Sequence, residues 1–275
     1  MIRSVALAMA AVAASAAGAS AQDADPERCP RLVAWQGEDA RLMPASYVIP
    51  AQADRTGTVR LTFVGHATFL IESPAGVTIA TDYNGVVRPN VVPRIATMNR
   101  AHSTHYTLFP EPGIAYVLHG WGDDGRPAEH ELTVDDVWLR NVTTNIRGGF
   151  GVSGAIQRDM NSMFVFEVAG LCILHLGHLH HALTETHLKA LGRIDVVLAP
   201  VDGSYTLSTD DMIAVLDAIN APLVIPMHYF GGASLAQFLA RLEETYRIET
   251  SDGPTVTLSR ATLPPMRTVL VLPGY

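Results

Sequence analysis

The stretch LCILHLGHLHHALTETHLKALGRIDVVLAPVDG, residues 171–203, gives the clearest indication of the fold. It opens with the apolar run LCILHLG, which predicts a strand, and ends in DVVLAPV, which predicts a second, buried strand. Between them, TETHLKALG predicts a helix that Thr184 caps and Gly192 ends. A strand, a helix and a further strand in succession are typical of chains that pack helices against a sheet.

The rest of the chain extends this pattern in both directions. Downstream, helices are predicted at 208–220 and 234–246, on either side of the buried strand PLVIPMHY, 222–229. The other predicted strands are TVRLTFVG, ATFLIES, GVTIATD, RIATM, IAYVLHG, VWLRNVTTN, NSMFVFEVAG, TVTLSRATL and RTVLVL. The first three, joined by Gly and Pro breaks, suggest a meander. Consecutive strands followed by alternating strands and helices predict packed sheets with helices outside, built as one domain over 57–275.

Two segments precede that domain. Residues 1–21, MIRSVALAMAAVAASAAGASA, combine one positive charge at Arg3, an Ala-rich apolar run and a small-x-small end, as a cleaved signal peptide does. A transmembrane anchor is the alternative, but the run is not Leu-rich and its only basic flank is N-terminal. We therefore expect a periplasmic or secreted protein. Residues 22–56 are polar and rich in proline breaks, which predicts an N-terminal extended lead-in.

The charge balance limits the possible partners. The formal net charge of −8 becomes −9 once the single arginine of residues 1–21 is removed. A chain this acidic is not expected to bind nucleic acid or an anionic membrane. No later run approaches the roughly 20 apolar residues that cross a bilayer, so no membrane insertion is expected after signal cleavage. A small molecule is the expected partner, and the sequence does not indicate an oligomeric state.

The chain has two cysteines, Cys29 and Cys172. An oxidising compartment permits a disulfide between them, although sequence alone does not give the distance that a bridge requires. Neither has a second cysteine at metal-ligand spacing. We expect two unpaired cysteines, with Cys172 buried in its apolar run.

Histidines gather at the ends of predicted strands. Those in such positions are His102, His105, His178, His180, His181 and His228. Loops beyond strand ends often hold functional groups, and imidazole suits zinc, iron and nickel. Their convergence predicts a metal site, although His228 alone would be ambiguous. His175 lies inside a strand and is expected to be packed and hydrogen-bonded. The isolated histidines His119, His130 and His187 receive no role.

Several segments together carry a family resemblance. RLTFVGHATFLIE, VTIATD, the stretch 171–203 and LVIPMHY resemble the metallo-β-lactamase-fold hydrolases. Within that superfamily they are similar to ascorbate-phosphate lactonase-like and related uncharacterised metal-dependent hydrolases. The resemblance covers roughly residues 57–240. It implies an α/β fold of the αββα sandwich type, in which two stacked mixed β-sheets are flanked by helices and a metal site lies at the edge.

The resemblance also interprets NRAHSTHYT, residues 99–107, where the family usually has His-x-His-x-Asp-His. His102 and His105 match, but Arg100 stands at the first histidine and Thr104 at the aspartate. In the later family segment Gly-Asp-x-Gly-His, His178 replaces the aspartate that bridges two metals. A further family histidine, expected in the middle of the chain, corresponds in uncertain register to Asn145.

These replacements imply a rebuilt, mononuclear centre. One metal position has lost two of its three ligands and is expected to be empty. The other keeps three imidazoles, from His105, His178 and His228. Three histidines with an open fourth position suit one zinc ion, with iron possible. Such a site can lower the pKa of bound water to about 7.

Other residues at matching positions have expected supporting roles. His102 would accept a proton in catalysis or be a relic, and Arg100 would either hold an anionic substrate group or only keep metal out. The supporting residues implied by the resemblance are His66, Asp82 and His181. Asp82 is expected as a buried hydrogen-bond acceptor, whereas His180 matches a family glycine and is expected to face solvent.

The leading hypothesis is an exported metal-dependent hydrolase that acts on an ester, lactone or phosphate ester, with a small anionic substrate. The alternative is a catalytically inactive protein of the same fold that binds a metal, a small anion or a protein partner. Loss of several ligands favours the alternative, but the change of an aspartate to His178 supplies a ligand. Redox chemistry at iron ranks behind both, because no carboxylate pattern for an oxygenase is evident. A true β-lactamase is disfavoured because the dinuclear ligands are missing.

Overall fold

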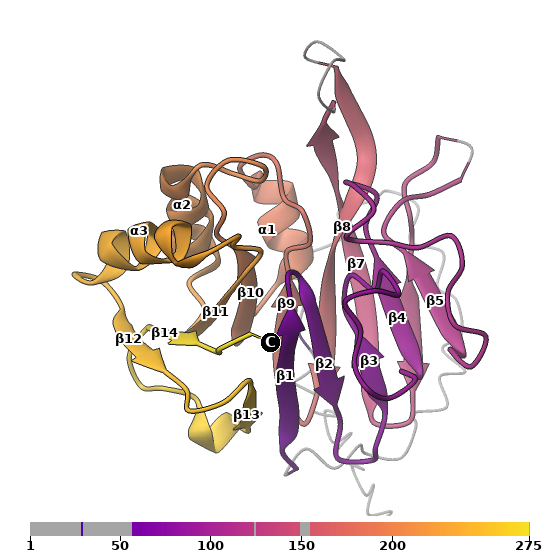
Figure 1. Cartoon of the computed structure of the whole chain (residues 1–275), viewed down its shortest axis with the longest axis horizontal. Coiled ribbons are helices and arrows are strands. Elements are labelled where there is room, and N and C mark those ends of the chain that lie inside the picture. Colours follow the sequence, from indigo (N-terminus) through magenta and orange to yellow (C-terminus); the bar gives the residue numbers. More distant parts are fainter. Residues whose placement is uncertain (1–28, 30–56, 124, 149–154, 275) are drawn as a thin grey trace, which may run out of the picture.

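The computed structural model describes residue 29 and residues 57–123, 125–148 and 155–274. The expected signal segment, 1–21, and the expected lead-in, 22–56, lie outside the described residues, except for Cys29. The described strands form two sheets, one of six strands and one of eight (Figure 1).

The six-stranded sheet begins with the expected meander. Its first strands are β1 (Val59–Gly65), β2 (Thr68–Glu72) and β3 (Thr78–Ala80), and each pairs antiparallel with the next. Two strands then add in parallel, β4 (Ile95–Met98) and β5 (Tyr116–His119). The sheet is completed by β13 (Thr255–Leu258), which returns from late in the chain to pair antiparallel with β1.

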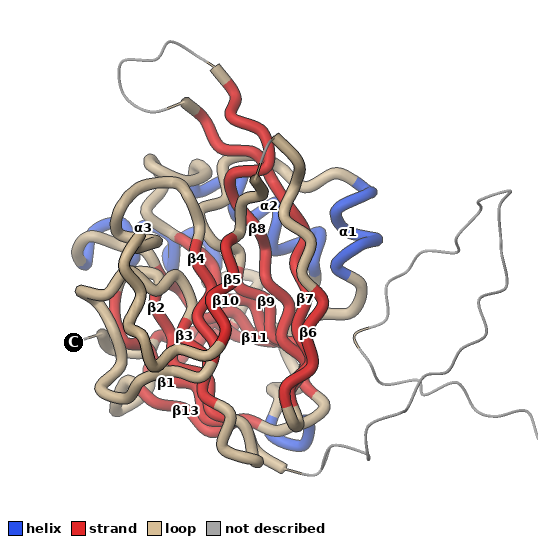
Figure 2. The backbone as a smooth tube through the Cα atoms, turned by 90° about the vertical axis from the view of Figure 1, so that its right-hand side faces the viewer, coloured by secondary structure: helices blue, strands red, loops and turns tan. Residues whose placement is uncertain are grey.

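The eight-stranded sheet has an antiparallel half and a parallel half. The antiparallel strands are β6 (Glu131–Val134), β7 (Val137–Arg147), β8 (Ile156–Val168) and β9 (Leu171–His175). The parallel strands continue from β9 through β10 (Val196–Pro200), β11 (Leu223–Met227), β14 (Thr268–Val271) and β12 (Arg247–Thr250). Figure 2 shows β7 and β8 running on beyond their neighbours.

The described part of the chain has three α-helices, which lie beside this larger sheet (Figure 1): α1 (Glu185–Leu191), α2 (Thr209–Ile219) and α3 (Gly232–Leu242). A short 3₁₀ turn, η1 (Arg260–Thr262), follows β13. The predicted start and end of α1 are confirmed, because Thr184 accepts a hydrogen bond from the backbone of His187 and Gly192 is the C-cap. Among the described residues, every helix is too short or too polar to span a bilayer.

The described residues form three buried apolar clusters, and β9 contributes to the two larger ones. Leu171 and Ile173 point into the cluster between the two sheets, whereas Cys172 and Leu174 join the cluster between the larger sheet and the helices. Because this strand is covered on both faces, its sequence is a continuous apolar run and does not alternate. The expected fold class, two stacked mixed sheets with helices, is confirmed.

The cysteines contradict the expectation that they are unpaired. Cys29 and Cys172 form a disulfide across 143 positions of sequence, and both are buried. The backbone N–H of Cys29 donates to Glu167 on β8, which holds this residue against the sheet. A cross-link that closes so long a loop stabilises the folded state by roughly 2–5 kcal/mol. The pairing depends on a tertiary contact, which the separation in sequence did not reveal.

Candidate metal centre

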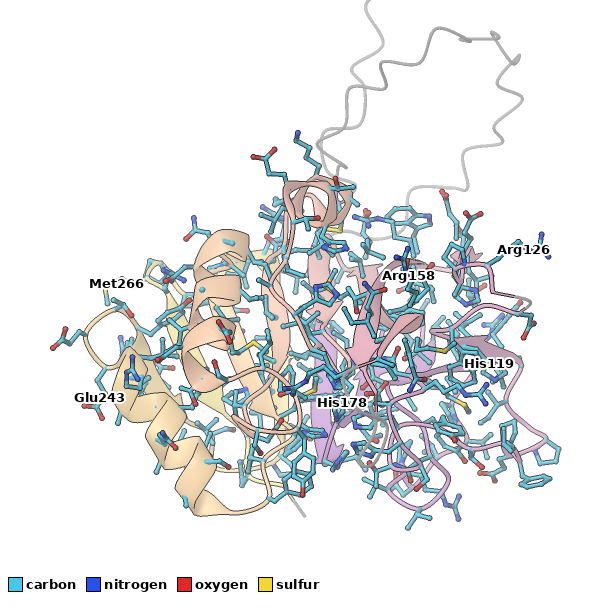
Figure 3. All side chains as sticks on the ribbon, turned by 90° about the horizontal axis from the view of Figure 1, so that it is seen from above. His119, Arg126, Arg158, His178, Glu243 and Met266 are labelled. Carbon is cyan, nitrogen blue, oxygen red and sulfur yellow. A yellow bond between two sulfur atoms is a disulfide. The ribbon has the colours of Figure 1, made fainter. Side chains whose placement is uncertain are left out.

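The strand-end residues singled out from the sequence meet at one edge of the molecule. Asp82 follows β3, His105 follows β4, His178 follows β9 and His228 directly follows β11. Asp82 and His105 follow parallel strands of the smaller sheet, and His178 and His228 follow parallel strands of the larger one. The carboxyl ends of parallel strands lie at the same edge of a sheet, and these edges of the two sheets meet at the histidines. In Figure 3, His178 lies near the middle of the molecule, with Met266 and Glu243 at one end and His119 at the other.

Four histidines form the centre. His102, His105, His178 and His228 each offer one ring nitrogen, and these four nitrogens lie within 4.8 Å of one another. Nε2 of His102 is 2.9 Å from Nε2 of His178, and Nε2 of His105 is 3.1 Å from Nε2 of His228. His105, His178 and His228 are buried, whereas His102 is partly exposed. The three expected ligands are therefore together, with His102 on the more open side.

Asp82 fixes the ring of His105. Its Oδ2 accepts a hydrogen bond of 2.6 Å from Nδ1 of His105, which leaves Nε2 of that ring to face the other histidines. Its Oδ1 accepts a bond of 2.8 Å from Asn99. Asp82 itself is fully buried with φ at 42°, an uncommon backbone conformation for a non-glycine residue. Burial raises the pKa of Asp82 to about 6, against the opposing influence of His175 and Asn99.

Asp202, which the sequence analysis did not select, does the same for His228. Its Oδ2 accepts a hydrogen bond of 3.0 Å from Nδ1 of His228. Burial alone would raise the pKa of Asp202, but hydrogen bonds from His228 and Thr206 outweigh it and hold the pKa well below its usual range. The same carboxylate also accepts the backbone N–H groups of Ser204 and Thr206, so it shapes the loop that carries it. The sequence did offer one signal for Asp202: it is an acidic residue two positions after the buried strand β10.

The remaining two rings are oriented by neighbours in the same loops. Nδ1 of His178 lies within hydrogen-bond distance of Nε2 of His180, and Nδ1 of His102 lies 2.6 Å from the hydroxyl of Thr104. The expectation that His180 only faces solvent is wrong, because its other nitrogen accepts from the backbone N–H of Arg147 at 2.6 Å. Thr104, which stands at the family aspartate, orients a histidine instead.

The four rings therefore share one arrangement: each Nδ1 has an outer partner. Burial lowers the pKa values of His105, His178 and His102, which keeps these imidazoles neutral and able to ligate. Two nitrogens bound tetrahedrally to one zinc ion at 2.0–2.1 Å would be about 3.4 Å apart. Nε2 of His105 and Nε2 of His228, two of the expected ligand atoms, are 3.1 Å apart, which is close to that value. An all-imidazole donor set of this kind fits one zinc ion and also suits iron, copper or nickel.

His66 lies against the centre without joining the four. Its ring centroid is 4.3 Å from that of His228, and its backbone oxygen accepts the N–H of His228 at 2.7 Å. Burial, followed by the neighbouring His228 and His102, lowers the pKa of His66 to about 3. Like Asp82, it has a positive φ, here 54°. These contacts place His66 where it can orient the loop that carries His228.

The remaining candidates lie farther out. The guanidinium of Arg100 lies over Trp121, 5.7 Å from the centre of its ring. His181 accepts the backbone N–H of Asn145 at 3.1 Å, while Oδ1 of Asn145 accepts the backbone N–H of Asp159. Neither belongs to the group of four. As expected, His175 is buried and hydrogen-bonded, with Nε2 2.8 Å from the oxygen of Ala67.

Known proteins share this sequence and fold. The family profile described as "Beta-lactamase superfamily domain" matches residues 60–228. A protein of Methanoculleus marisnigri named UPF0173 metal-dependent hydrolase is 26% identical over 214 residues, which cover 70% of this chain and 91% of the relative. A relative from Methanospirillum hungatei with the same name is 24% identical, with 73% and 95% covered.

A solved structure from Thermotoga maritima agrees with these matches. It is named as a Zn-dependent hydrolase of the metallo-beta-lactamase superfamily. It superposes with a TM-score of 0.58 at 29% identity and covers 79% of this chain and 100% of its own. The profile match spans more than half of the chain and contains all four histidines of the centre. The chain therefore belongs to the beta-lactamase superfamily and has the metallo-beta-lactamase fold.

Proposed function

We propose that the protein is a metal-dependent hydrolase with a mononuclear centre, and that it acts on a small ester, lactone or phosphate ester. The observation that carries the proposal is the convergence of four imidazole nitrogens within 4.8 Å, each ring oriented from its outer side. The similar proteins from Methanoculleus marisnigri and Thermotoga maritima are both named as metal-dependent or zinc-dependent hydrolases, which supports the same reading.

The three buried histidines, His105, His178 and His228, are the proposed ligands of a single ion, zinc by preference and iron as the other candidate. What such an ion supplies is Lewis acidity, which polarises a substrate oxygen and acidifies water. Asp82 and Asp202 each hold one ligand ring in the tautomer that presents Nε2. This outer layer keeps the donor set in place without contributing a carboxylate to it.

His102 is the proposed proton acceptor. It is the one partly exposed member of the four, so it stands on the side from which a substrate and water can approach. The hydroxyl of Thr104, 2.6 Å from its Nδ1, fixes the ring and leaves Nε2 directed inward. A positioned imidazole can take the proton that an attacking water loses. If His102 is instead a fourth ligand, its removal will lower metal affinity as much as removal of a buried histidine.

We also propose that the protein works outside the cytoplasm, either in the periplasm or secreted. The disulfide between Cys29 and Cys172 supports this location, because such bonds persist in oxidising compartments and are rare in the cytosol.

The test of the proposed function combines metal content with turnover. Elemental mass spectrometry of untagged protein is expected to give about one metal ion per chain. His178→Ala is expected to lose both the ion and activity toward aryl esters, alkyl esters, lactones and bis-aryl phosphates. Absence of metal after incubation with zinc or iron would overturn the proposal. One bound ion without turnover on any of these substrates would favour a metal-binding protein that is not an enzyme.

A further inference from the structure

Two aromatic side chains stand exposed beside the candidate metal centre. Phe230 lies two residues after His228 and is 62% exposed, and Tyr205, three residues after Asp202, is 49% exposed. Their ring centroids are 5.5 Å apart with the planes nearly perpendicular. The Phe230 ring also lies 5.2 Å from the ring of His228. Large apolar side chains in contact with one another on a surface commonly mark a binding site.

The loop that carries Tyr205 is held firmly. The carboxylate of Asp202 accepts the backbone N–H groups of residues 204–206, and the guanidinium of Arg147 donates to the carbonyls of the same three residues. Both the donors and the acceptors of this turn are therefore satisfied by side chains. Tyr205 is presented from a fixed backbone, and little conformational entropy is lost when a ligand packs against it.

Phe230 packs against histidines of the candidate metal centre and its surroundings. Its ring lies 5.6 Å from that of His66, whose backbone oxygen accepts the N–H of His228. The two aromatic residues thus come from loops that are tied to the same buried pair, Asp202 and His228, which form a hydrogen bond of 3.0 Å. An apolar group that packs against the exposed faces of both rings would lie next to the proposed metal ligands.

We propose that Tyr205 and Phe230 form an aromatic clamp that receives an aryl group of the substrate beside the bond to be hydrolysed. The clamp deepens the proposed function, on which it rests, by selecting aryl esters or aryl phosphates over small alkyl ones. An aryl ring gains edge-to-face contact with two rings whose arrangement already favours that geometry, and it covers apolar surface that otherwise faces water. An alkyl group as small as methyl or ethyl reaches too little of this surface to benefit equally.

The first test measures binding and does not depend on turnover. Calorimetry compares phenylphosphonate with methylphosphonate on metal-loaded protein, since both carry the same anionic group and only one carries the ring. Phenylphosphonate is expected to bind about tenfold more tightly. The double variant Tyr205→Ala, Phe230→Ala is expected to reduce this ratio to below about threefold, while Tyr205→Phe retains it. An equal ratio in the wild type and the double variant contradicts the clamp.

The second test compares kcat/KM for phenyl acetate and ethyl acetate. The ratio between the two substrates is compared between proteins, so the greater intrinsic reactivity of the aryl ester cancels. The double variant is expected to lower the aryl-to-alkyl ratio about tenfold and to keep its metal content. Met266→Ala is the control, because Met266 is 60% exposed and lies at the far end of the molecule from His178 (Figure 3).

The outcomes separate the two proposals. Turnover of both esters with a ratio that the double variant leaves unchanged overturns the clamp and leaves the hydrolase proposal standing. A phosphonate preference that the variant abolishes, in a protein that hydrolyses nothing, supports the clamp as a binding site and overturns the hydrolase. Loss of bound metal in the double variant would show that the rings support the centre instead of the substrate, and would also overturn the clamp.

Discussion

Gly177 and Asn99 approach so closely that a Cβ atom on the glycine would lie 2.5 Å from Nδ2 of the asparagine, and closer still to the side-chain oxygen of Asn161. Both asparagines support the candidate centre. Asn99 donates to Asp82 and accepts the backbone N–H of Ser162 on the other sheet, and Asn161 accepts the N–H of His178. Gly177, with φ at 61°, leaves the space in which these amides join the two sheets below the histidines.

Replacing Gly177 by alanine is therefore expected to damage the metal site. The methyl group displaces Asn99 and Asn161, which loosens Asp82 and His178, and metal affinity should fall about 10- to 100-fold. Stability should fall by roughly 1–3 kcal/mol, since the site also needs a positive φ. Chelator competition and urea unfolding measure the two effects. Gly253→Ala is the matched control, because its added Cβ meets no atom within 4 Å; equal losses in both variants would refute this account.

Asp202→Asn tests whether the carboxylate orients His228. The amide keeps the size of the side chain but removes the negative charge of the carboxylate, which accepts hydrogen bonds from Nδ1 of His228 and the hydroxyl of Thr206. Zinc affinity is expected to fall about 10- to 100-fold, measured against a chelator of known affinity. Asp210→Asn, at an exposed acid on α2, should leave the affinity unchanged. Wild-type affinity in Asp202→Asn would show that the loop holds His228 without this charge.

Comparison of His102→Ala with His105→Ala distinguishes a proton acceptor from a ligand. We expect His102→Ala to retain about one metal ion per chain while kcat falls roughly 100-fold or more, within the range that general bases contribute. His105→Ala should lose the ion, because that ring is fully buried between Asp82 and His228. Titration with zinc, followed by turnover of the loaded proteins, gives both numbers. Comparable loss of metal in both variants would make His102 the fourth ligand.

Removal of the metal should lower the thermal stability of the protein. The ion binds only where the strands have brought His105, His178 and His228 together, so it stabilises the folded chain alone. At free zinc 100-fold above the dissociation constant, the gain is about 2.7 kcal/mol. Scanning calorimetry with and without a chelator should show a lower Tm for the stripped protein. If the chelator leaves the Tm of the wild type unchanged while His178→Ala has a different Tm, the substitution acts on the structure alone.

The disulfide is expected to stabilise the fold without influencing the centre. Cys172 lies near the start of β9, while His178 follows its other end. At about 3.3 Å per residue, Cys172 is about 10 Å from the last residue of β9, His175, and His178 lies three residues farther along the chain. Cys29→Ser, Cys172→Ser should therefore cost roughly 2–5 kcal/mol in urea unfolding but retain the metal content and kcat of the wild type. Loss of metal under native conditions would show that the bond also positions β9.

The sequence predicted most strongly what apolar patterning and strand ends determine. The buried strands β9, β10 and β11 were found because both of their faces are covered, and the loops after β4, β9 and β11 contained the histidines. β6 and β12 were missed because they are short strands at the two edges of the larger sheet and have largely exposed, polar sequences. Such strands depend on a neighbour for their hydrogen bonds, which local pattern does not reveal.

At the candidate site, the sequence could not predict in which direction each side chain points. Arg100 follows β4 more closely than His102 and His105 do, yet its guanidinium lies over Trp121, which follows β5. Asp202 is one of several acids in loops, and only its distance from His228 distinguishes it. The roles assigned to His66, Asp82 and His181 by resemblance remain predictions, although His66 packs against His228 and Asp82 hydrogen-bonds to His105.

The bridge between Cys29 and Cys172 also determines what happens when the backbone is cut. A protease that cleaves any peptide bond between residues 30 and 56 divides the polypeptide, yet both pieces remain one covalent molecule through the two sulfur atoms. Such a nicked protein would keep its full mass on a non-reducing gel and separate into two bands only after thiol treatment. The early part of the chain therefore remains fastened to the folded domain even when the backbone that links them is broken.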